Sequence, residues 1–293
     1  MATRSSKVGI RGNSKKFEFI HIDKVMFPGP GYTKGDVLEF YRKIAPLLLP
    51  HLRDRPVTVE RLPDGVVPGA KRFWQKNIPS YYPDWVPRIK LPTQEGTKVT
   101  YALVNDLDTL LYLVNQGALT FHVWLSRIGS LKMPDYVLFD LDLGEAKFFA
   151  EVKIALHLRD LLSQRKAEAY VKASGKTGLH VLTPWKGNGN YAAARAWAMQ
   201  IAQQVVRDLP DLATVDRLKD ERRAHVYIDV IQNAMGHHVV PPYVLRAVPE
   251  ATVSTPLGWD ELTARLNPKT FTMSAVLRRI TGQKHDLMQA LTS

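Results

Sequence analysis

The sequence predicts an α/β protein in which a sheet packs on helices, and two observations lead to this fold class. Short apolar runs rich in β-branched and aromatic residues alternate with longer segments whose apolar residues repeat every three to four positions. Between residues 136 and 230 this alternation gives the order strand, helix, strand, hairpin, helix, strand. That order is typical of a sheet that is packed against helices.

Length and composition indicate a globular chain with a basic surface. The 293 residues suffice for one large or two modest domains, and 45% of them are hydrophobic. A formal net charge of +12 favours a polyanionic partner, nucleic acid first, although a generic basic surface would give the same charge. The absence of cysteine excludes disulfides, cysteine-bound zinc, iron–sulfur clusters and thiol nucleophiles, and it fits a reducing cytoplasm.

The chain is predicted to be one domain behind a short tail. Residues 1–16 are polar and basic, contain no apolar core of signal-peptide length, and are expected to be a flexible basic tail. Residues 17–293 are assigned to a single domain, with an N-terminal α/β part at 17–118 and a catalytic sheet part at 119–293. No apolar run approaches the length of a membrane span, so the sequence predicts a soluble cytoplasmic protein with no membrane partner.

The N-terminal part is predicted to combine several strands with two helices. Residues 71–77 interleave bases with Phe73 and Trp74 and are expected to form a loop. These aromatics fit a platform on which nucleic-acid bases stack, and a core pair with a solvated charged rim fits equally well. His122 alone is more typical of a structural histidine than of a ligand. The predicted strands are 17–22, 56–61, 99–105 and 119–125, and the predicted helices are 37–49 and 109–116.

Two aspartates interrupt the apolar strand predicted at residues 136–144. Asp140 and Asp142 are two positions apart, so their side chains point to the same side of the strand. Adjacent carboxylates repel and are costly to bury, and a divalent cation such as magnesium or manganese removes that cost. Two alternatives stay open: an Asx-capped strand end with solvated carboxylates, and a haloacid-dehalogenase-like phosphatase with Asp140 as its nucleophile. An EF-hand is not favoured, because no further ligands follow at loop spacing.

A third carboxylate strengthens the metal-site interpretation. The apolar strand predicted at residues 224–230 contains Asp229. Two strands, one with a D-x-D pair and one with a single aspartate, offer three carboxylates to a metal pair, as two-metal phosphoryl transfer requires. The phosphatase alternative does not explain the net charge, and it expects its D-x-D near the start of the domain rather than at residue 140.

The segment 174–180, Ser-Gly-Lys-Thr-Gly-Leu-His, lies between these two strands. A P-loop does not fit, because its first glycine would fall at Tyr170 and because a strand rather than a helix follows. A turn of this composition between strands 168–173 and 179–183 can form a backbone nest for phosphate beside Lys176; an ordinary hairpin is the alternative. The remaining predictions are helices at 147–164 and 191–209, a charged loop at 219–223 and a tail at 273–291 that ends in helix.

Four motifs together resemble the polymerase domain of bacterial ligase D, which belongs to the archaeo-eukaryotic primase superfamily. They are Phe-Asp-Leu-Asp at 139–142, Ser-Gly-Lys-Thr-Gly-Leu-His at 174–180, Tyr-Ile-Asp at 227–229 and Pro-Pro-Tyr-Val-Leu-Arg at 241–246. The resemblance runs from Asp23 to Leu257 and covers most of the chain. It implies a primase-like catalytic core with an RRM-like sheet beside an N-terminal α/β part.

The resemblance implies a template-dependent nucleotidyltransferase that fills gaps and extends broken ends in non-homologous end joining, with a preference for ribonucleotides. Its substrates would be NTPs or dNTPs and DNA that carries gaps or broken ends, with a 5′-phosphate or a 3′ overhang. It also implies a two-metal site for Mn²⁺ or Mg²⁺, a nucleoid-associated location in the cytoplasm, and Ku and a separate DNA ligase as partners. A basic DNA-end-binding module without catalysis is the non-enzymatic alternative.

The resemblance further assigns residues to three roles. The catalytic metal ligands would be Asp140, Asp142 and Asp229. Nucleotide binding would fall to Ser174, Lys176, Thr177, His180, His122, Arg222 and Arg246. DNA contacts would come from Lys24 and Lys34 at the 5′-phosphate of the downstream strand, from Phe73 and Trp74 at the template, and from Arg61 and Lys219.

Some positions depart from the family pattern. His21 stands where an asparagine often precedes the first pocket lysine, and Glu60 stands where some relatives have a base. Both bear on DNA contact and leave the catalytic set intact. No ligase or nuclease segment is recognised, so a stand-alone polymerase or an excised domain is expected. Lys24 and Lys34 flank a Gly/Pro turn, and a helix expected to begin near residue 35 would add its partly positive N-terminus to a phosphate pocket.

Overall fold

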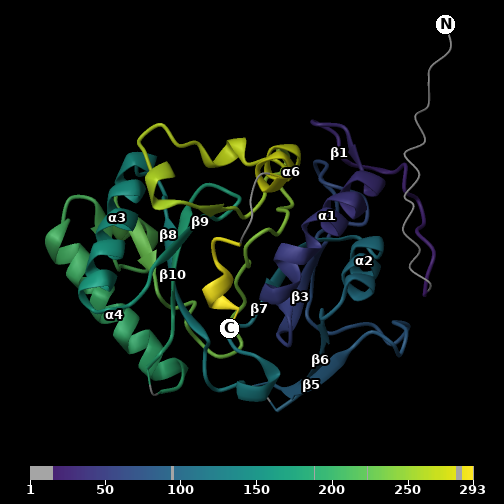
Figure 1. Ribbon diagram of the computed structural model, residues 1–293, viewed down its shortest axis with the longest axis horizontal. Helices are drawn as coiled ribbons and strands as arrows, with labels where there is room; N and C mark the ends of the chain where they lie inside the picture. The colour runs from purple at the N-terminus through teal and green to yellow at the C-terminus, as the bar shows by residue number, and fades with distance from the viewer. Residues whose placement is uncertain (1–15, 94–95, 188, 223, 282–285, 293) are drawn as a thin grey trace, which may run out of the picture.

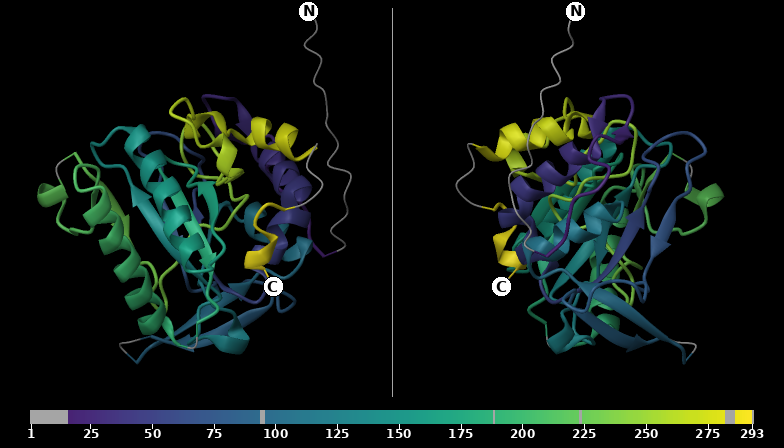
Figure 2. Two further views of the ribbon diagram at one scale, coloured as in Figure 1. Left: turned by 60° about the vertical axis from the view of Figure 1, so that its left-hand side comes forward. Right: turned by 90° about the vertical axis from the view of Figure 1, so that its right-hand side faces the viewer.

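The structure is a computed structural model and describes residues 16–93, 96–187, 189–222, 224–281 and 286–292. Within these residues it is a mixed α/β protein, which confirms the predicted class. Two sheets form its two parts, and the helices of the two parts lie on opposite sides of the molecule (Figures 1 and 2). No helix in the described ranges is long and apolar enough to cross a membrane.

The C-terminal part is a six-stranded sheet. Its strands are β8 (Tyr136–Asp142), β9 (Tyr170–Ala173), β10 (Leu179–Pro184), β11 (Ala213–Thr214), β12 (Val226–Asp229) and β13 (Pro256–Leu257). They lie in the order β11-β12-β8-β10-β9-β13, and all neighbours are antiparallel except β11 and β12. Helices α3 (Phe148–Gln164) and α4 (Tyr191–Asp208) cover one face of this sheet (Figure 1).

The central strand β8 contributes to two hydrophobic cores at once. Val137, Phe139 and Leu141 are buried in the core beneath α3 and α4. Tyr136 and Leu138 point the other way, into the core of the N-terminal part. Because successive side chains of a strand alternate between faces, Asp140 and Asp142 continue on the side of Tyr136 and Leu138. The carboxylates therefore face the N-terminal part rather than the helices.

The N-terminal part is built on a second sheet. Its strands are β3 (Pro56–Arg61), β4 (Phe73–Gln75), β5 (Arg88–Pro92), β6 (Lys98–Leu103) and β7 (Ala118–Val123). They lie in the order β4-β3-β6-β5, and β7 also pairs with β3. Helix α1 (Lys34–Leu52) and helix α2 (Leu107–Asn115) pack together against this sheet. A two-stranded ribbon, β1 (Val25–Phe27) and β2 (Tyr32–Thr33), precedes α1.

The chain after β12 returns to the N-terminal core. Helix α6 (Met273–Thr281) packs on α1, and the side chains of Val239, Leu245 and Val253 are buried in the same core (Figure 1). The described ranges also contain four short 3-10 helices, at Ile128–Ser130, Trp259–Glu261, Pro268–Thr270 and Gln289–Leu291. The expected division of the chain near residue 118 stays a prediction, and β7, just after that point, belongs to the N-terminal sheet.

Some element predictions are wrong. Residues 17–22 form no strand; the Phe17 ring instead stacks on Trp85 with 5.9 Å between ring centroids. Phe73–Gln75, expected in a loop, is strand β4, and Lys219–Arg222, expected in a charged loop, is the short helix α5. Of the predicted tail, Met273–Thr281 is helix α6 and Gln289–Leu291 is a 3-10 helix, which agrees with the prediction that it ends in helix. Residues 1–15 of the expected flexible tail lie outside the described ranges.

Candidate active site

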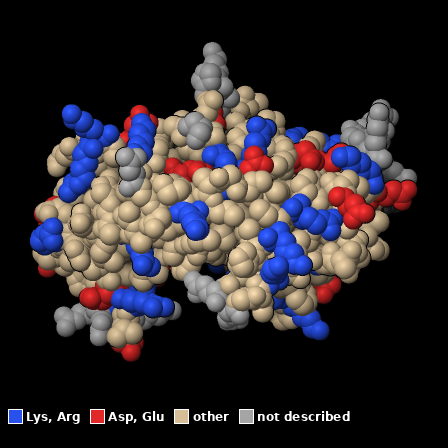
Figure 3. All heavy atoms as spheres, turned by 90° about the horizontal axis from the view of Figure 1, so that it is seen from below, with Lys and Arg blue, Asp and Glu red and all other residues tan. Residues whose placement is uncertain are grey.

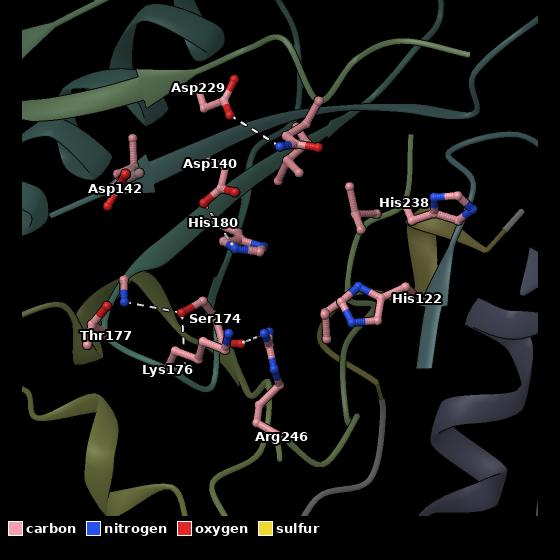
Figure 4. A pocket seen from close by; sticks show the side chains of 16 residues that line it. His122, Asp140, Asp142, Ser174, Lys176, Thr177, His180, Asp229, His238 and Arg246 are labelled. Atoms are coloured by element: carbon pink, nitrogen blue, oxygen red, sulfur yellow. Dashed lines mark hydrogen bonds and ion pairs between the residues drawn. The ribbon is translucent and has the colours of Figure 1, made fainter. Parts of the chain in front are cut away.

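A cavity of about 370 Å³ lies between the two parts of the molecule. Its walls come from β7, β8, β10 and β12, from the turn that joins β9 to β10, and from the segment between residues 232 and 246. Figure 4 shows their polar side chains converging on one space. The predicted residues in its lining are His122, Asp140, Asp142, Ser174, Lys176, Thr177, His180, Asp229 and Arg246.

The register of three adjacent strands places the central carboxylates. Asp140 on β8 is the cross-strand partner of Asp229 on β12 and of His180 on β10. Directly opposed residues of antiparallel strands have Cβ atoms about 5 Å apart. Asp142 lies two positions beyond Asp140, on the same face and opposite Tyr227. Pairs of residues that are 40 to 90 positions apart in sequence thus become immediate neighbours.

Each of these carboxylates has a polar partner. Nε2 of His180 lies 3.2 Å from an Asp140 oxygen, and Nη1 of Arg222 donates to Asp142 at 2.8 Å. Asp229 accepts from the backbone N–H of Ile231 at 2.8 Å. Burial alone would raise the pKa of Asp140, but the nearby imidazole and the buried cations around it lower that pKa below its usual value. Asp140 is therefore held as an anion.

The carboxylate oxygens of the three aspartates are chemically suited to bind a divalent cation. In the part of the chain that the structure describes, no three Asp, Glu or His side chains are gathered tightly enough to form a ready metal site. Yet Asp140, Asp142 and Asp229 all line one cavity and come from adjacent strands. Carboxylate oxygens are the hard ligands that Mg²⁺ and Mn²⁺ prefer. At present Arg222 balances the negative charge of Asp142, and the His180 ring contacts Asp140; a bound cation would take over the role of Arg222.

The turn after β9 supplies the opposite, positive side of the cavity. The Ser174 hydroxyl accepts from the backbone N–H groups of Lys176 and Gly178, at 3.2 and 3.1 Å, which holds the turn closed. Arg246 donates from Nη1 to the Ser174 carbonyl at 2.8 Å, while its Nε has no hydrogen-bond partner among the described residues. Burial lowers the pKa of Arg246 to about 10 and also lowers that of Lys176. Two partly desolvated cations beside a backbone turn suit an anion such as a phosphate.

His122 reaches the cavity from the other sheet, on β7 (Figure 4). It is buried, and its Nε2 has no hydrogen-bond partner within the described residues. Burial, and then the charge of Arg246, hold the pKa of His122 well below its usual range, so the ring is neutral. The Trp74 ring packs against it with 4.7 Å between ring centroids. His122 therefore offers an unsatisfied polar atom to a ligand.

The residues predicted at the template lie together in a second cavity of about 500 Å³. Arg61, Phe73 and Trp74 line it, and Arg61 donates from Nη1 to the Gln75 side chain at 2.6 Å. Phe73 is 48% exposed and Trp74 is 55% exposed, so neither is the core residue of the alternative interpretation. The Trp74–His122 contact joins this aromatic cavity to the first one.

Arg222, Lys24 and Lys34 do not line either cavity. Arg222 contacts Asp142 and stacks over the Tyr227 ring, 3.9 Å from its centroid. The side chain of Lys219 lies outside the described set. Lys34 is the first residue of α1 and donates to the Ile20 carbonyl at 2.7 Å, whereas Lys24 pairs with Asp64 at 2.9 Å. The structure thus puts Lys24 and Lys34 near each other at the helix N-terminus, apart from the carboxylates.

Sequence reasoning missed several residues of the first cavity. Gln232 and His238 line it, and Lys172 lies directly behind His180 with its Nζ 2.9 Å from Nδ1. Gln232 and His238 follow β12 in an irregular segment, which gives no periodic signal. Lys172 was detectable, because a hairpin centred on residue 176 pairs residue 172 with residue 180. The surface seen from below carries lysine and arginine side chains on both sides of the molecule rather than in one patch (Figure 3).

An antiparallel sheet that presents three carboxylates to a cavity with a basic turn and buried cations defines a nucleotidyltransferase of the primase-polymerase class. The family model described as "LigD, primase-polymerase domain" matches residues 33–288. The chain belongs to this family, and the predicted recognition, enzyme class and fold are confirmed. This membership disfavours the phosphatase alternative.

Individual relatives agree with this assignment. The chain is 34% identical over 270 residues to the bifunctional non-homologous end joining protein LigD of Bacillus subtilis, covering 92% of this chain and 43% of that protein. It is 34% identical over 243 residues to the multifunctional LigD protein of Mycolicibacterium smegmatis, covering 82% of this chain and 32% of that protein. The chain thus spans less than half the length of these curated relatives.

A solved structure shows the same fold. The polymerase domain from Mycobacterium tuberculosis ligase D, determined in complex with DNA, superposes with a TM-score of 0.88 at 30% sequence identity. The match covers 94% of this chain and 98% of that domain. The archaeo-eukaryotic primase-like fold expected from the sequence is therefore present.

Proposed function

We propose that this chain adds nucleotides to DNA 3′ ends under the direction of a template, in gaps and at broken ends, as part of non-homologous end joining. The cross-strand pair of Asp140 and Asp229 facing the basic turn at Ser174 and Lys176 is the observation that carries this proposal. Carboxylates on one wall and phosphate-binding groups on the other are the two halves that phosphoryl transfer needs. The relatives named for end joining supply the biological context.

The chain's own residues bind and orient the reactants. Lys176, Arg246 and the turn at Ser174 would bind the triphosphate and offset its charge. Asp140, Asp142 and Asp229 would hold two divalent ions, Mg²⁺ or Mn²⁺, on the opposite wall. When bound, such ions lower the pKa of the primer hydroxyl and neutralise charge on the phosphates. When a metal ion binds Asp142, the ion pair between Arg222 and Asp142 would weaken or break.

The sugar of the incoming nucleotide would lie against His122. Its unpartnered Nε2 is buried at the cavity wall and can hydrogen-bond a hydroxyl group. A site that hydrogen-bonds a hydroxyl discriminates against an analogue that lacks it. We therefore propose a preference for ribonucleotides, with Ser174 and His180 completing the contacts.

The DNA would lie across the aromatic cavity. The exposed rings of Phe73 and Trp74 can stack on template bases, with Arg61 beside them. Lys24 and Lys34 would bind the 5′-phosphate of the downstream strand, with the Lys219 region as a further backbone contact. Ku and a separate DNA ligase are the proposed partners, at the nucleoid in the cytoplasm.

An extension assay tests this function and its alternatives. Labelled gapped DNA is incubated with NTPs or dNTPs and Mn²⁺ or Mg²⁺, for wild type, Asp140→Asn and Asp229→Asn. We expect extension by wild type with higher kcat/KM for NTPs, and a loss of at least about a hundredfold in either variant, because one missing ligand costs several kcal/mol of transition-state stabilisation. DNA affinity should be nearly unchanged.

Each other outcome of this assay contradicts one part of the proposed function. Near-native extension by either aspartate variant contradicts the carboxylate mechanism. Wild-type binding of DNA without extension supports the non-catalytic end-binding module, and hydrolysis of a phosphatase substrate supports the phosphatase. Equal efficiency with NTPs and dNTPs refutes the sugar preference alone.

A further inference from the structure

We propose that Lys172 is a positioning residue that fixes which nitrogen of His180 carries its proton, so that the imidazole presents an N–H to the catalytic cavity. This inference rests on the proposed function, because it concerns the side chain that lies between Asp140 and the nucleotide site. Lys172 itself does not line the cavity and contacts no reacting group.

Lys172 is the fourth member of a row that crosses the sheet. Asp229, Asp140, His180 and Lys172 are successive cross-strand partners on β12, β8, β10 and β9. The row passes from carboxylates through an imidazole to an ammonium or amine group. The imidazole is the only member that touches a neighbour on each side, at 3.2 Å to Asp140 and 2.9 Å to Lys172. Through these two contacts of His180, Lys172 can influence the group that faces Asp140.

Lys172 is held in place from its other side. It is fully buried, with 0% of its surface exposed, which is rare for lysine. Its Nζ lies 2.7 Å from Oγ of Ser254 and 2.9 Å from Nδ1 of His180. The Ser254 hydroxyl lies 3.3 Å from the Ala173 carbonyl, to which it can donate, so its oxygen is left to accept from Lys172. The lysine is therefore held between the Ser254 hydroxyl and the His180 ring, and in its charged form it can only donate to both.

The proton position on His180 follows from this donor. A neutral imidazole has one donor nitrogen and one acceptor nitrogen. When Lys172 donates to Nδ1, the ring proton must lie on Nε2, the atom that faces Asp140 (Figure 4). The charged form of lysine has no lone pair and can only donate, and the neutral form still has two N–H groups, one for each acceptor.

The arrangement has a functional consequence. The Nε2 proton is available either to Asp140 or to an oxygen of a bound triphosphate. Without Lys172 the ring could rotate or carry its proton on Nδ1, and Nε2 would then present a lone pair to anionic groups. Such a change should weaken nucleotide binding and leave the fold intact, since methionine fills a similar volume.

The direct test is the ¹⁵N NMR spectrum of His180 in histidine-labelled protein without nucleotide or metal. His180→Gln identifies its resonances by their loss. We expect wild type to carry the proton on Nε2 and Lys172→Met to show a mixture or the Nδ1 form. Lys153→Met, an exposed lysine on α3, is the matched control and should leave the His180 resonances in place. A wild-type protein protonated at Nδ1, or unchanged resonances in Lys172→Met, overturns the proposal.

Kinetics provide the second readout. Lys172→Met should raise KM for the nucleotide about tenfold, as expected for one lost hydrogen bond to a charged group, with a smaller change in kcat. His180→Ala should have a similar effect, and the double variant should add little, because both changes remove the same Nε2–H donor from the cavity. Fully additive effects contradict the proposal. If Lys172→Met does not fold, Ser254→Ala, which removes the acceptor that anchors Lys172, takes its place in both measurements.

The two readouts separate this proposal from the proposed function. If the wild-type protein fails to extend DNA, the nucleotidyl-transfer proposal fails while the NMR experiment still reports the His180 proton. If extension is normal and the resonances do not respond to Lys172→Met, only the role of Lys172 is wrong.

Discussion

At the scale of single residues, Gly178 shows how tightly the turn between β9 and β10 packs against its neighbours. A Cβ atom at this position would meet the backbone carbonyl of Leu141 and would lie 2.8 Å from Oε1 of Glu151. Glu151 also accepts a hydrogen bond from the backbone N–H of Leu179. The turn is thus fixed to the catalytic strand β8 and to the first turn of α3 through one glycine. A side chain here must displace backbone rather than a flexible side-chain end.

We expect Gly178→Ala to raise KM for the nucleotide several-fold and to lower the free energy of unfolding by about 1–3 kcal/mol, the usual cost of overpacking. Steady-state kinetics and urea unfolding measure the two effects. Gly129→Ala is the matched control, because a Cβ there would meet nothing within 4 Å. A Gly178→Ala protein that behaves like this control would show that the turn is free to shift.

The sequence predicts the carboxylates at this scale better than their neighbours. Asp140, Asp142 and Asp229 stand out because charges interrupt apolar strands, and the register then brings them together. Lys172 is detectable only through the register of the hairpin, because one lysine in a four-residue strand by itself resembles an ordinary surface residue. The position of His238 depends on how an irregular segment folds back, which no local pattern encodes.

At the scale of elements, the N-terminus of α1 carries a lysine, Lys34, whose charge can be tested by experiment. Lys34 is its first residue, only 7% exposed, and burial followed by the charge of Lys24 lowers its pKa to about 8. Thr33 and Asp36 form a capping box that fixes the helix N-terminus. A phosphate near these groups would meet the helix dipole and two lysines.

We expect gapped DNA with a 5′-phosphate to bind more tightly than the same DNA with a 5′-hydroxyl. Lys24→Ala with Lys34→Ala should erase this difference and spare extension on an open template–primer. The preference should shrink with added salt, because phosphate contacts release counterions, and also above pH 8, where Lys34 loses its charge. Paired binding titrations measure it.

The matched control is Lys43→Ala, an exposed lysine farther along α1. If wild type binds both DNA ends equally, or if the double variant keeps the preference, the phosphate is bound elsewhere.

The predicted elements agree with the structure where a local sequence pattern marks them, and they fail where tertiary contacts determine the secondary structure. Residues 56–61 and 136–142 match their predicted strands, because β-branched runs and flanking turn residues mark them clearly. Residues 17–22 alternate like a strand, yet in the part of the chain that the structure describes no strand pairs with them, and Phe17 packs on aromatic rings instead. Strand β4 was missed because its pairing with Glu60 and Arg61 of β3 is a long-range contact.

At the scale of the whole molecule, buried neutral histidines link stability to pH. Burial lowers the pKa of His51, His122 and His238, the last to about 3. His238 also accepts from Nε1 of Trp124 at 3.1 Å, which requires an unprotonated nitrogen. The unfolded chain binds more protons than the native one once the pH falls below the usual histidine pKa, so acid favours unfolding.

We expect the free energy of unfolding to fall between pH 7 and pH 5.5 by about 1 kcal/mol for each of His122 and His238. Urea unfolding at several pH values measures this slope, and His238→Gln should reduce it. His21→Gln, at an exposed position, is the control. A slope that does not change in His238→Gln would contradict the assignment. Glu151, whose pKa burial raises well above its usual value, acts in the opposite direction.

The placement of His122 on one sheet and of His180 and the carboxylates on the other has a consequence for ligand energetics. A nucleotide in the cavity would bridge two separate hydrophobic cores, and its binding free energy would oppose their separation. At a concentration one hundred times its dissociation constant, it would add about 2.7 kcal/mol to the stability of the native state. The melting temperature would then report occupancy without any turnover, and the backbone amides of β7 and β10 would exchange with solvent more slowly together.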